Sequence, residues 1–262
     1  MTSYVTTAID ARGVATVTLD NPEKHNAFDD KIIAELTDAF INADNDPAVR
    51  VMVLASNGRN FSAGGDLNWM KRMASYSHEE NRKDAQALAN LLKVLNFMSK
   101  PTIARIQGAA FGGAVGLVSC CDMAIATERA SFSLSEVKIG LMPATISPYV
   151  VAAMGQRASR RYFATAERFS ADEALRLGLV AQLVADEEAL DAAVCSLVDL
   201  LLANSPAAMA ASKQLVFEVA GQSIDEALID MTCQRIADIR VSPEGQEGLS
   251  AFLEKRSPNW IQ

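Results

Sequence analysis

The stretch FSAGGDL, from Phe61 to Leu67, and the stretch QGAAFGGAVGL, from Gln107 to Leu117, decide the fold of this chain. An apolar run with the character of a strand comes before each of them, VRVMVLAS at 49–56 and PTIARI at 101–106. Residues with helical spacing follow each stretch. Both stretches therefore predict a turn from a strand into a helix, with glycines that permit positive φ and let a ligand approach the backbone.

Such turns have a chemical use. The first N–H groups of a helix lack partners inside the helix, and the macrodipole adds partial positive charge there. Two turns that face each other would offer two N–H donors to one oxygen, which is an oxyanion hole. The phosphate-binding patterns G-x-x-x-x-G-K-[ST] and G-x-G-x-x-G and the nucleophile elbow G-x-S-x-G are missing. A purely structural tight connection remains the alternative.

The composition is that of a globular protein. Of 262 residues, 50% are hydrophobic and 21% are charged, which suffices for a sizeable core. The net charge of -8 argues against nucleic acid as a partner, because nucleic-acid binding needs clustered basic charge. The N-terminus has no signal-peptide pattern, and no apolar run reaches the ~18 residues of a membrane span. We expect a soluble, cytoplasmic protein without a membrane segment.

Metal and thiol chemistry are not indicated. The chain has two histidines, and its four cysteines show no C-x-x-C spacing. Cys120 and Cys121 lie in an apolar stretch that reads as a strand, so we expect them to be buried small hydrophobes. We predict no metal ion and no cofactor.

Capping patterns predict where several elements begin. Residues 3–20 alternate around Gly13 as a hairpin would, and residues 29–45 have helical spacing with Asp29 or Asp30 as N-cap. Capping boxes are predicted at Ser77 with Glu80, at Ser170 with Glu173 and at Ser223 with Glu226, and Ser242 before Pro243 predicts a further helix start.

The order of these elements predicts an α/β fold. Strand, turn and helix repeat in ββα units, and from about Thr145 the signals are almost entirely helical. No linker rich in glycine and serine separates the two parts. We predict a core over residues 1–200 and a C-terminal helical region over residues 201–262 that packs on the core or on neighbouring subunits.

Glu136, in SFSLSEVKIGLMP (131–143), is the best candidate for acid/base chemistry. A carboxyl group after an apolar strand and before an apolar turn is expected to be partly desolvated, which raises its pKa. The alternative is a solvated loop glutamate or a helix-cap partner.

The ordered set FSAGGDL, GAAFGG, SCCDMAIAT and EGLSAFLEKRSPNW resembles the enoyl-CoA hydratase/isomerase family, also called the crotonase family, over essentially the whole chain. The resemblance implies the spiral (ββα)n crotonase fold and an acyl-CoA thioester as substrate. It implies that the N–H groups of Gly65 and Gly113 hold the thioester oxygen and that Glu136 is the catalytic carboxyl group. It also implies a homo-oligomer, a trimer or a dimer of trimers.

The resemblance further implies a CoA site. The loop KHNAF and the turn FSAGGDL match segments that contact CoA largely through backbone atoms, which makes binding candidates of His25, Ala27, Ala63, Asp66 and Leu67. Asp66 could instead only fix the turn. Phe252 and Lys255 match positions that reach the adenine and phosphate from a neighbouring subunit, although a solvated helix face explains Lys255 nearly as well.

One departure from the family pattern is informative. The best-known hydratases carry another glutamate three residues after the glycine pair, and this chain has Gly116 there. Three explanations are open. Glu136 could act without a second carboxyl group and pass a proton from water to C2 in one syn addition. Alternatively, the protein could be a Δ3,Δ2-enoyl-CoA isomerase, which needs one base. Third, a carboxylate of the substrate could hold the water.

A finer resemblance favours hydration. GDLNWMKRM, SEVKIGLMPATISP and RIADIRVSPEGQEGLSAFLEKR resemble methylglutaconyl-CoA hydratases of leucine breakdown and isohexenylglutaconyl-CoA hydratases of terpenoid breakdown, whose substrates carry a second carboxylate. Candidate cationic partners for that group are Lys71, Arg72, Arg157, Arg160 and Arg161.

The sequence disfavours two other classes of protein. A non-catalytic RNA-binding or scaffold protein on the same fold is disfavoured by the negative charge and by the presence of Glu136. A serine peptidase on a related fold is disfavoured because no Ser/His arrangement is recognisable.

Overall fold

A six-stranded sheet forms the centre of the computed structural model, which describes residues 3–261. Its strand order is β1-β2-β3-β4-β6-β9. The strands are β1 (Val5–Ile9), β2 (Val14–Leu19), β3 (Val51–Ser56), β4 (Thr102–Ile106), β6 (Met123–Thr127) and β9 (Gln182–Val184). β1 and β2 form the predicted antiparallel hairpin, with Gly13 at φ 83°, and the other pairs are parallel.

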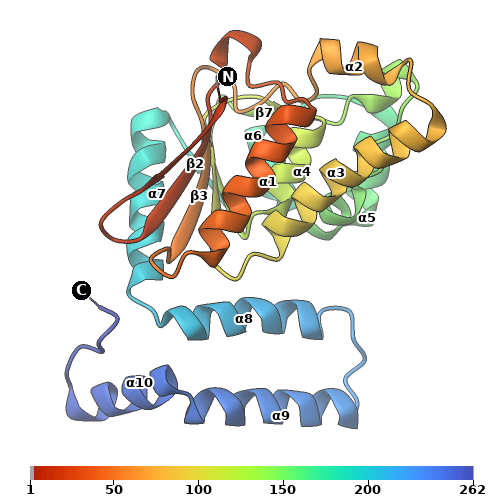
Figure 1. Cartoon of the computed structure of the whole chain (residues 1–262). Coiled ribbons are helices and arrows are strands. Elements are labelled where there is room, and N and C mark those ends of the chain that lie inside the picture. The colour runs from red at the N-terminus through yellow and green to blue at the C-terminus, as the bar shows by residue number, and fades with distance from the viewer. Residues whose placement is uncertain (1–2, 262) are drawn as a thin grey trace.

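Helices cover both faces of this sheet (Figure 1). On one face, Met52 and Leu54 of β3 join the main core, which includes α1 (Asp30–Asn45), α3 (His78–Asn96) and α4 (Gly113–Cys120). On the other face, Val51 and Val53 pack in a second cluster with α7 (Glu187–Leu202). The continuous apolar run of β3 follows from this double coverage, because residues on both faces of the strand are buried.

A small second sheet links the glycine turns to the loop that carries Glu136. It consists of β5 (Ala110–Phe111), β7 (Ser131–Ser133) and β8 (Phe169–Ser170) in the order β5-β7-β8. Gly112 N–H continues the β5–β7 pairing by donating to the Ser133 carbonyl at 2.8 Å. The 3₁₀ turn η2 (Glu136–Ile139) begins three residues later, so the pairing places Glu136 next to the second glycine turn.

Most of the predicted helix starts are confirmed. Asp29 caps α1 by accepting from Ile32 N–H, and Ser77 and Glu80 form the complete capping box of α3. Ser170 caps α6 (Ala171–Leu177), and Ser242 caps α10 (Pro243–Glu254) with proline in its first turn. Short polar side chains thus supply acceptors for N–H groups that would otherwise lack partners.

Two local predictions are wrong. Asp225, not Ser223, caps α9 (Glu226–Val241), because its carboxylate accepts from Leu228 N–H. Cys120 ends helix α4 rather than lying in a strand; it is buried, and burial raises the pKa of its thiol. The part after Thr145 is almost entirely helical, as predicted, and its two short strands, β8 and β9, complete the two sheets.

Two more helices complete the core. The short α2 (Leu67–Met73) follows the first glycine turn, and a 3₁₀ turn, η1 (Pro22–Lys24), precedes α1. α5 (Ser147–Thr165) is broken at Gly155, which has φ 77° and ψ 159° and so lies outside the helical region. α5 packs on α4, and β8 follows it in the chain.

The C-terminal helices α8 (Pro206–Val219), α9 and α10 form a layer outside the core (Figure 1). Neither α8 nor α9 has a buried residue. The Arg50 guanidinium ties this arm to the start of β3, donating to the carbonyl oxygens of Trp260, Leu202 and Asn204 at 2.9, 3.0 and 2.9 Å. In the described part of the chain, no single helix is long and apolar enough to cross a membrane, although α7 and α8 together, bent by 103°, meet the criteria of length and composition.

Candidate active site

The two glycine turns lie against each other. Ser62 N–H donates to the Ala109 carbonyl at 3.0 Å, and Phe111 N–H donates to the Ser62 carbonyl at 3.0 Å. Gly64 has φ 89°, and a Cβ atom there would lie 2.8 Å from the Phe111 carbonyl oxygen. Only glycine fits at this position, because both the backbone conformation and the close approach of the second turn exclude a side chain.

The N–H groups of Gly65 and Gly113 are free. The backbone of Phe28 makes hydrogen bonds to the residues on both sides of Gly65: its N–H donates to the Gly64 carbonyl, and its carbonyl accepts from Asp66 N–H. Gly113 is the first residue of α4, so its N–H has no partner within the helix. Within residues 3–261 neither N–H group donates a hydrogen bond. The contacting turns therefore carry two unused donors in neighbouring loops, as an oxyanion hole requires.

Ser62 holds the first turn in shape, and the sequence reasoning missed it. Its side chain is fully buried, and its Oγ accepts from Gly64 N–H at 3.1 Å. The hydroxyl group thus satisfies the Gly64 N–H within the turn. A hydroxyl residue two positions before the first glycine was its only signal in the sequence.

Glu136 lies beside the second turn. A Cβ atom on Gly112 would be 3.3 Å from Glu136 Oε1. Its other carboxylate oxygen, Oε2, is buried and has no hydrogen-bond partner among the described residues. Burial raises the pKa of Glu136 above its ordinary value, because a desolvated carboxylate is disfavoured. A carboxyl group held near two free N–H donors and short of partners is suited to exchanging protons with a bound molecule.

Gly116, where the best-known hydratases have a glutamate, is packed against apolar atoms. A Cβ atom on Gly116 would lie 2.3 Å from Ile146 Cγ2 and 3.3 Å from Leu92 Cδ2. Ile146 is itself 1% exposed. Ile146 therefore fills the space at this position, and a glutamate there would require the chain around Ile146 to move.

The loop KHNAF is fixed to the first turn. Ala63 N–H donates to the His25 carbonyl at 2.9 Å. Asn26, buried and at φ 55°, donates through Nδ2 to the carbonyls of Asn57 and Asn60 and accepts from Asn21 N–H through Oδ1. The predicted CoA-binding residues His25, Ala27 and Ala63 thus lie in two segments that hydrogen bonds join. The sequence did not reveal the role of Asn26 in fixing them.

Asp66 fixes the turn, as one of its two sequence interpretations expects. Its carboxylate accepts from Asn68 and Trp69 N–H and so caps α2. Burial tends to raise the pKa of Asp66, but the hydrogen bond from Trp69 N–H and the contact with Lys24 at 3.2 Å outweigh it and hold the pKa below its ordinary value. Leu67, by contrast, is 73% exposed beside this cap and is open to contact.

Two predicted residues are not brought to the turns within one subunit. Phe252, which is 81% exposed, and Lys255, in the left-handed conformation at the end of α10, belong to the C-terminal arm. Figure 1 places α10 at the opposite end of the molecule from α2. A second subunit would have to carry them to this site.

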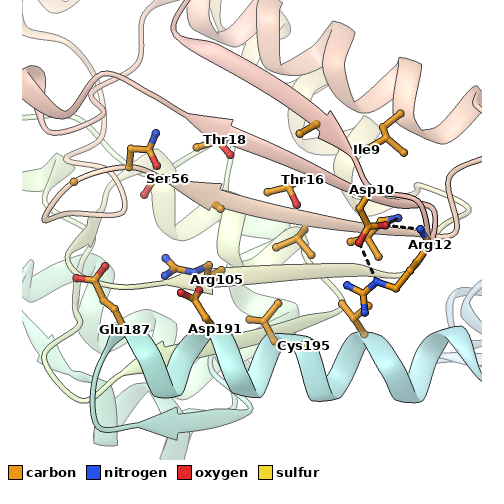
Figure 2. A pocket seen from close by; sticks show the side chains of 18 residues that line it. Ile9, Asp10, Arg12, Thr16, Thr18, Ser56, Arg105, Glu187, Asp191 and Cys195 are labelled. Carbon is orange, nitrogen blue, oxygen red and sulfur yellow. Dashed lines mark hydrogen bonds and ion pairs between the residues drawn. The ribbon is translucent and has the colours of Figure 1, made fainter.

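A cleft of about 580 Å³ on the other face of the sheet, between β1, β2, β3 and α7, is a separate feature (Figure 2). Its arginines are already paired: Arg12 with Asp10 and Asp199, and Arg105 with Asp191. Glu136 and the glycine turns do not line it. Within the described residues, no group of three or more His, Cys, Asp or Glu side chains could hold a metal ion.

Comparisons with known proteins show the family of this chain. The model of the family Enoyl-CoA hydratase/isomerase matches residues 10–262. The solved structure of an enoyl-CoA hydratase from Shewanella pealeana is 51% identical, with a TM-score of 0.95, covering 98% of this chain and 96% of that one. An enoyl-CoA hydratase structure from Mycobacterium smegmatis is 34% identical, with a TM-score of 0.92 and 100% coverage of both chains. A crotonyl-CoA hydratase from Syntrophomonas wolfei is 30% identical over 95% of this chain and 94% of its own length.

Replacing Gly116 should reveal the contact with Ile146. We expect Gly116→Ala to lower the free energy of unfolding by about 1–3 kcal/mol, because the added methyl group overpacks a buried site. The double variant with Ile146→Ala should lose less free energy of unfolding than the two single variants lose together, since the shortened side chain makes room for the methyl group. Urea denaturation of the four proteins measures this coupling. Strictly additive losses would contradict the proposed contact.

Glu136→Gln should stabilise the protein at neutral pH. The raised pKa of Glu136 means that the ionised carboxylate penalises the folded state above that pKa, whereas below the ordinary glutamate value of 4.5 the group is protonated in both states. The variant should therefore unfold at higher urea than the wild type at pH 7.5, and the difference should vanish as the pH falls below 4.5. Glu128→Gln, at an exposed position, is the matched control and should show no such trend. A pH-independent difference would rule out burial of the charge as its cause.

Proposed function

Because this chain belongs to the enoyl-CoA hydratase/isomerase family, we propose that it hydrates an α,β-unsaturated acyl-CoA whose acyl part carries a second carboxylate, 3-methylglutaconyl-CoA or a related compound of branched-chain amino acid or terpenoid breakdown. By family and relatives the chain is an enoyl-CoA hydratase. The carboxylated substrate is the finer part of the proposal. The single observation that supports catalysis at this site is the carboxyl group of Glu136, which lacks a hydrogen-bond partner at Oε2 and lies beside the second glycine turn with its free N–H donor.

In the proposed mechanism the N–H groups of Gly65 and Gly113 polarise the thioester oxygen. Electron density from the C2–C3 double bond moves toward that oxygen as the water oxygen bonds to C3. Glu136 accepts the proton that water loses and delivers a proton to C2, so that water adds as H and OH. The two donors stabilise the enolate charge, which develops only during the reaction. No metal or redox cofactor enters this proposal, and CoA is part of the substrate.

The packing at Gly116 supports a role for the substrate's own carboxylate. Ile146 occupies the space beside Gly116. The protein therefore offers one carboxyl group, whereas the best-known hydratases offer two. A water molecule held by one carboxylate needs a second acceptor, and the distal carboxylate of a glutaconyl-type acyl chain can be that acceptor.

Ion pairs within the protein reduce the number of candidate cationic partners for that carboxylate. Arg72 is already paired with Asp30, and Arg161 is paired with Glu167 at 2.7 Å. Lys71, Arg157 and Arg160 have no ion pair within residues 3–261. We propose that the partner of the distal carboxylate comes from these three residues.

The second candidate function is Δ3,Δ2-enoyl-CoA isomerisation. The same observation favours it, because moving a double bond requires one base that takes a proton from one carbon and returns it to another. The two reactions share the thioester donors and Glu136 and differ only in whether water is consumed.

A panel of enoyl-CoA thioesters in ¹⁸O-enriched water tests the proposal. We expect ¹⁸O in the product of 3-methylglutaconyl-CoA, and much slower turnover at saturation of crotonyl-CoA, which lacks the distal carboxylate. Product without label would mean isomerisation, and equal turnover of both substrates would remove the role of the substrate carboxylate. Mass spectrometry distinguishes these outcomes.

The same assay tests Glu136. Glu136→Gln should lower the turnover number by about 10²–10⁴-fold, since it removes general acid/base catalysis, while the affinity for CoA stays nearly unchanged. The matched control is Glu128→Gln, which should retain wild-type turnover. A fully active Glu136→Gln enzyme would mean that the proton is carried by another group.

We also propose that residues 201–262 assemble this chain into a trimer or a dimer of trimers. Apolar side chains are exposed along the arm: Val216, Phe217, Ile229, Ile236, Val241, Leu249, Phe252 and Leu253. Exposed large apolar side chains in such number are costly in water and are typical of an interface. Assembly would also supply the neighbouring Phe252 and Lys255 to the CoA site.

Sedimentation velocity of the full chain tests this assembly. We expect a species of three or six copies, and we expect the double substitution Phe252→Ser with Leu253→Ser to shift it toward smaller species, because it makes the apolar face polar. Ile9→Ser, at an exposed position in β1 outside residues 201–262, should leave the mass unchanged. A wild-type monomer at micromolar concentration would contradict the proposal.

A further inference from the structure

The backbone of Phe28 sets the direction of the first free donor. Phe28 pairs with Gly65 in an isolated parallel bridge, and its N–H donates to the Gly64 carbonyl at 2.9 Å. The Gly64 carbonyl and the Gly65 N–H belong to one planar trans peptide unit, in which they point in opposite directions. The hydrogen bond from Phe28 therefore fixes where the Gly65 N–H points.

A second hydrogen bond from the same residue holds the other side of Gly65. The Phe28 carbonyl accepts from Asp66 N–H at 3.0 Å. Both peptide units of Gly65 are thus attached to the backbone of Phe28, whereas the Gly65 N–H itself has no acceptor among residues 3–261.

The ring of Phe28 reaches the second free donor. A Cβ atom on Gly113 would lie 2.6 Å from Phe28 Cζ and 3.2 Å from Phe28 Cε2. The tip of the ring therefore lies against the backbone of Gly113, the first residue of α4. So close a contact is possible only because residue 113 has no side chain.

The ring has little freedom to move. The Phe28 side chain is fully buried and belongs to the main core. Phe28 directly precedes Asp29, the N-cap of α1, and buried Ile33 stands at the fourth helical position. These are the two positions of a hydrophobic staple, which fixes how the chain enters a helix. In a close-packed core a ring held in this way acts as a rigid spacer.

We propose that Phe28 is a positioning residue, which sets the separation and direction of the Gly65 and Gly113 N–H groups. Its backbone holds the first donor, and its ring holds the second. The inference rests on the proposed function in one respect, that these two donors bind the thioester oxygen, and it applies equally to hydration and to isomerisation. Both donors must lie within hydrogen-bond distance of one oxygen to stabilise the charge that develops there.

Kinetics of Phe28→Leu test the spacer. The variant keeps both backbone hydrogen bonds and an apolar side chain, but it lacks the ring tip that touches Gly113. We expect kcat for 3-methylglutaconyl-CoA to fall by roughly 10–100-fold, because a misplaced donor costs most in the transition state. KM should stay within about twofold of wild type, since most of the binding contacts remain.

Phe40→Leu is the matched control. Phe40 is equally buried in the same core, further along α1, and the substitution removes the same atoms. It should lower the temperature of thermal unfolding but leave kcat unchanged. Equal losses of kcat in the two variants would mean that Phe28 acts only through the stability of the core. If Phe28→Leu does not fold, Phe28→Met takes its place, because the unbranched side chain adapts to irregular core space.

Infrared spectroscopy of a bound thioester measures the donors without turnover. The probe is glutaryl-CoA with ¹³C at the thioester carbonyl; it has no double bond, so it cannot be hydrated or isomerised. Two N–H donors should lower its carbonyl stretching frequency in the wild type relative to water. Phe28→Leu should move the band back toward the value in water, and Phe40→Leu should keep the wild-type band.

The two kinds of failure are distinct. A lowered band in the wild type that Phe28→Leu leaves unchanged would overturn the role of Phe28 alone. A wild type whose band equals that in water would contradict the thioester site of the proposed function and, with it, any role for Phe28 there.

Gly113→Ala tests the contact from its other side. A methyl group at residue 113 and the Phe28 ring cannot occupy the same space, so this variant should also lose kcat. Combined with Phe28→Leu, which makes room, it should lose less than the product of the two single losses. Losses that multiply independently would contradict the contact as the means by which Phe28 positions Gly113.

Discussion

The close contact of the two glycine turns is the constraint on which the rest of the site depends. The Phe111 carbonyl approaches Gly64 so closely that a Cβ atom would lie 2.8 Å from it. Backbone hydrogen bonds between Ser62, Ala109 and Phe111 hold the turns at this distance, and the buried Ser62 hydroxyl group satisfies Gly64 N–H. The N–H groups of Gly65 and Gly113 are left without acceptors as a result. A main-chain donor held by packing needs no reorganisation when charge develops on a ligand.

The same small sheet that carries the second turn also delivers the carboxyl group. β5 pairs with β7, and Glu136 follows β7 by three residues, so backbone pairing sets its distance from Gly112. Its buried Oε2 has no partner within the described chain, which is a costly state unless a bound molecule supplies one. Close by, Ile146 packs against Gly116 and removes the room for a second carboxyl group. The site thus combines one carboxyl group whose ionised form is disfavoured with apolar packing at Gly116.

Charge is distributed unevenly in this acidic protein. Most ion pairs lie on the exposed surface, where they contribute little to stability. Two cationic side chains that have no ion pair among residues 3–261, Arg59 and Arg168, lie next to the turns. The C-terminal arm shows the apolar counterpart: Arg50 anchors it through three carbonyl oxygens, yet its outer face stays exposed. Within the described part of one subunit these two arginines have no carboxylate partner, and the apolar side chains of the arm have no neighbour that covers them.

The sequence by itself determined the strand-to-helix turns, the hairpin at Gly13, most helix caps and the choice of Glu136 as candidate acid, because these depend on neighbours within a few residues. It misplaced the cap of α9, which Asp225 provides, and did not reveal the short strand β9, whose residues carry too little periodicity. Only the tertiary structure decided that Ser62 and Asn26 are buried clamps, that Ile146 fills the space at Gly116, and that Arg59, Arg129 and Arg168 share one cavity. These contacts join residues far apart in the chain, and no local pattern encodes which distant side chains will meet.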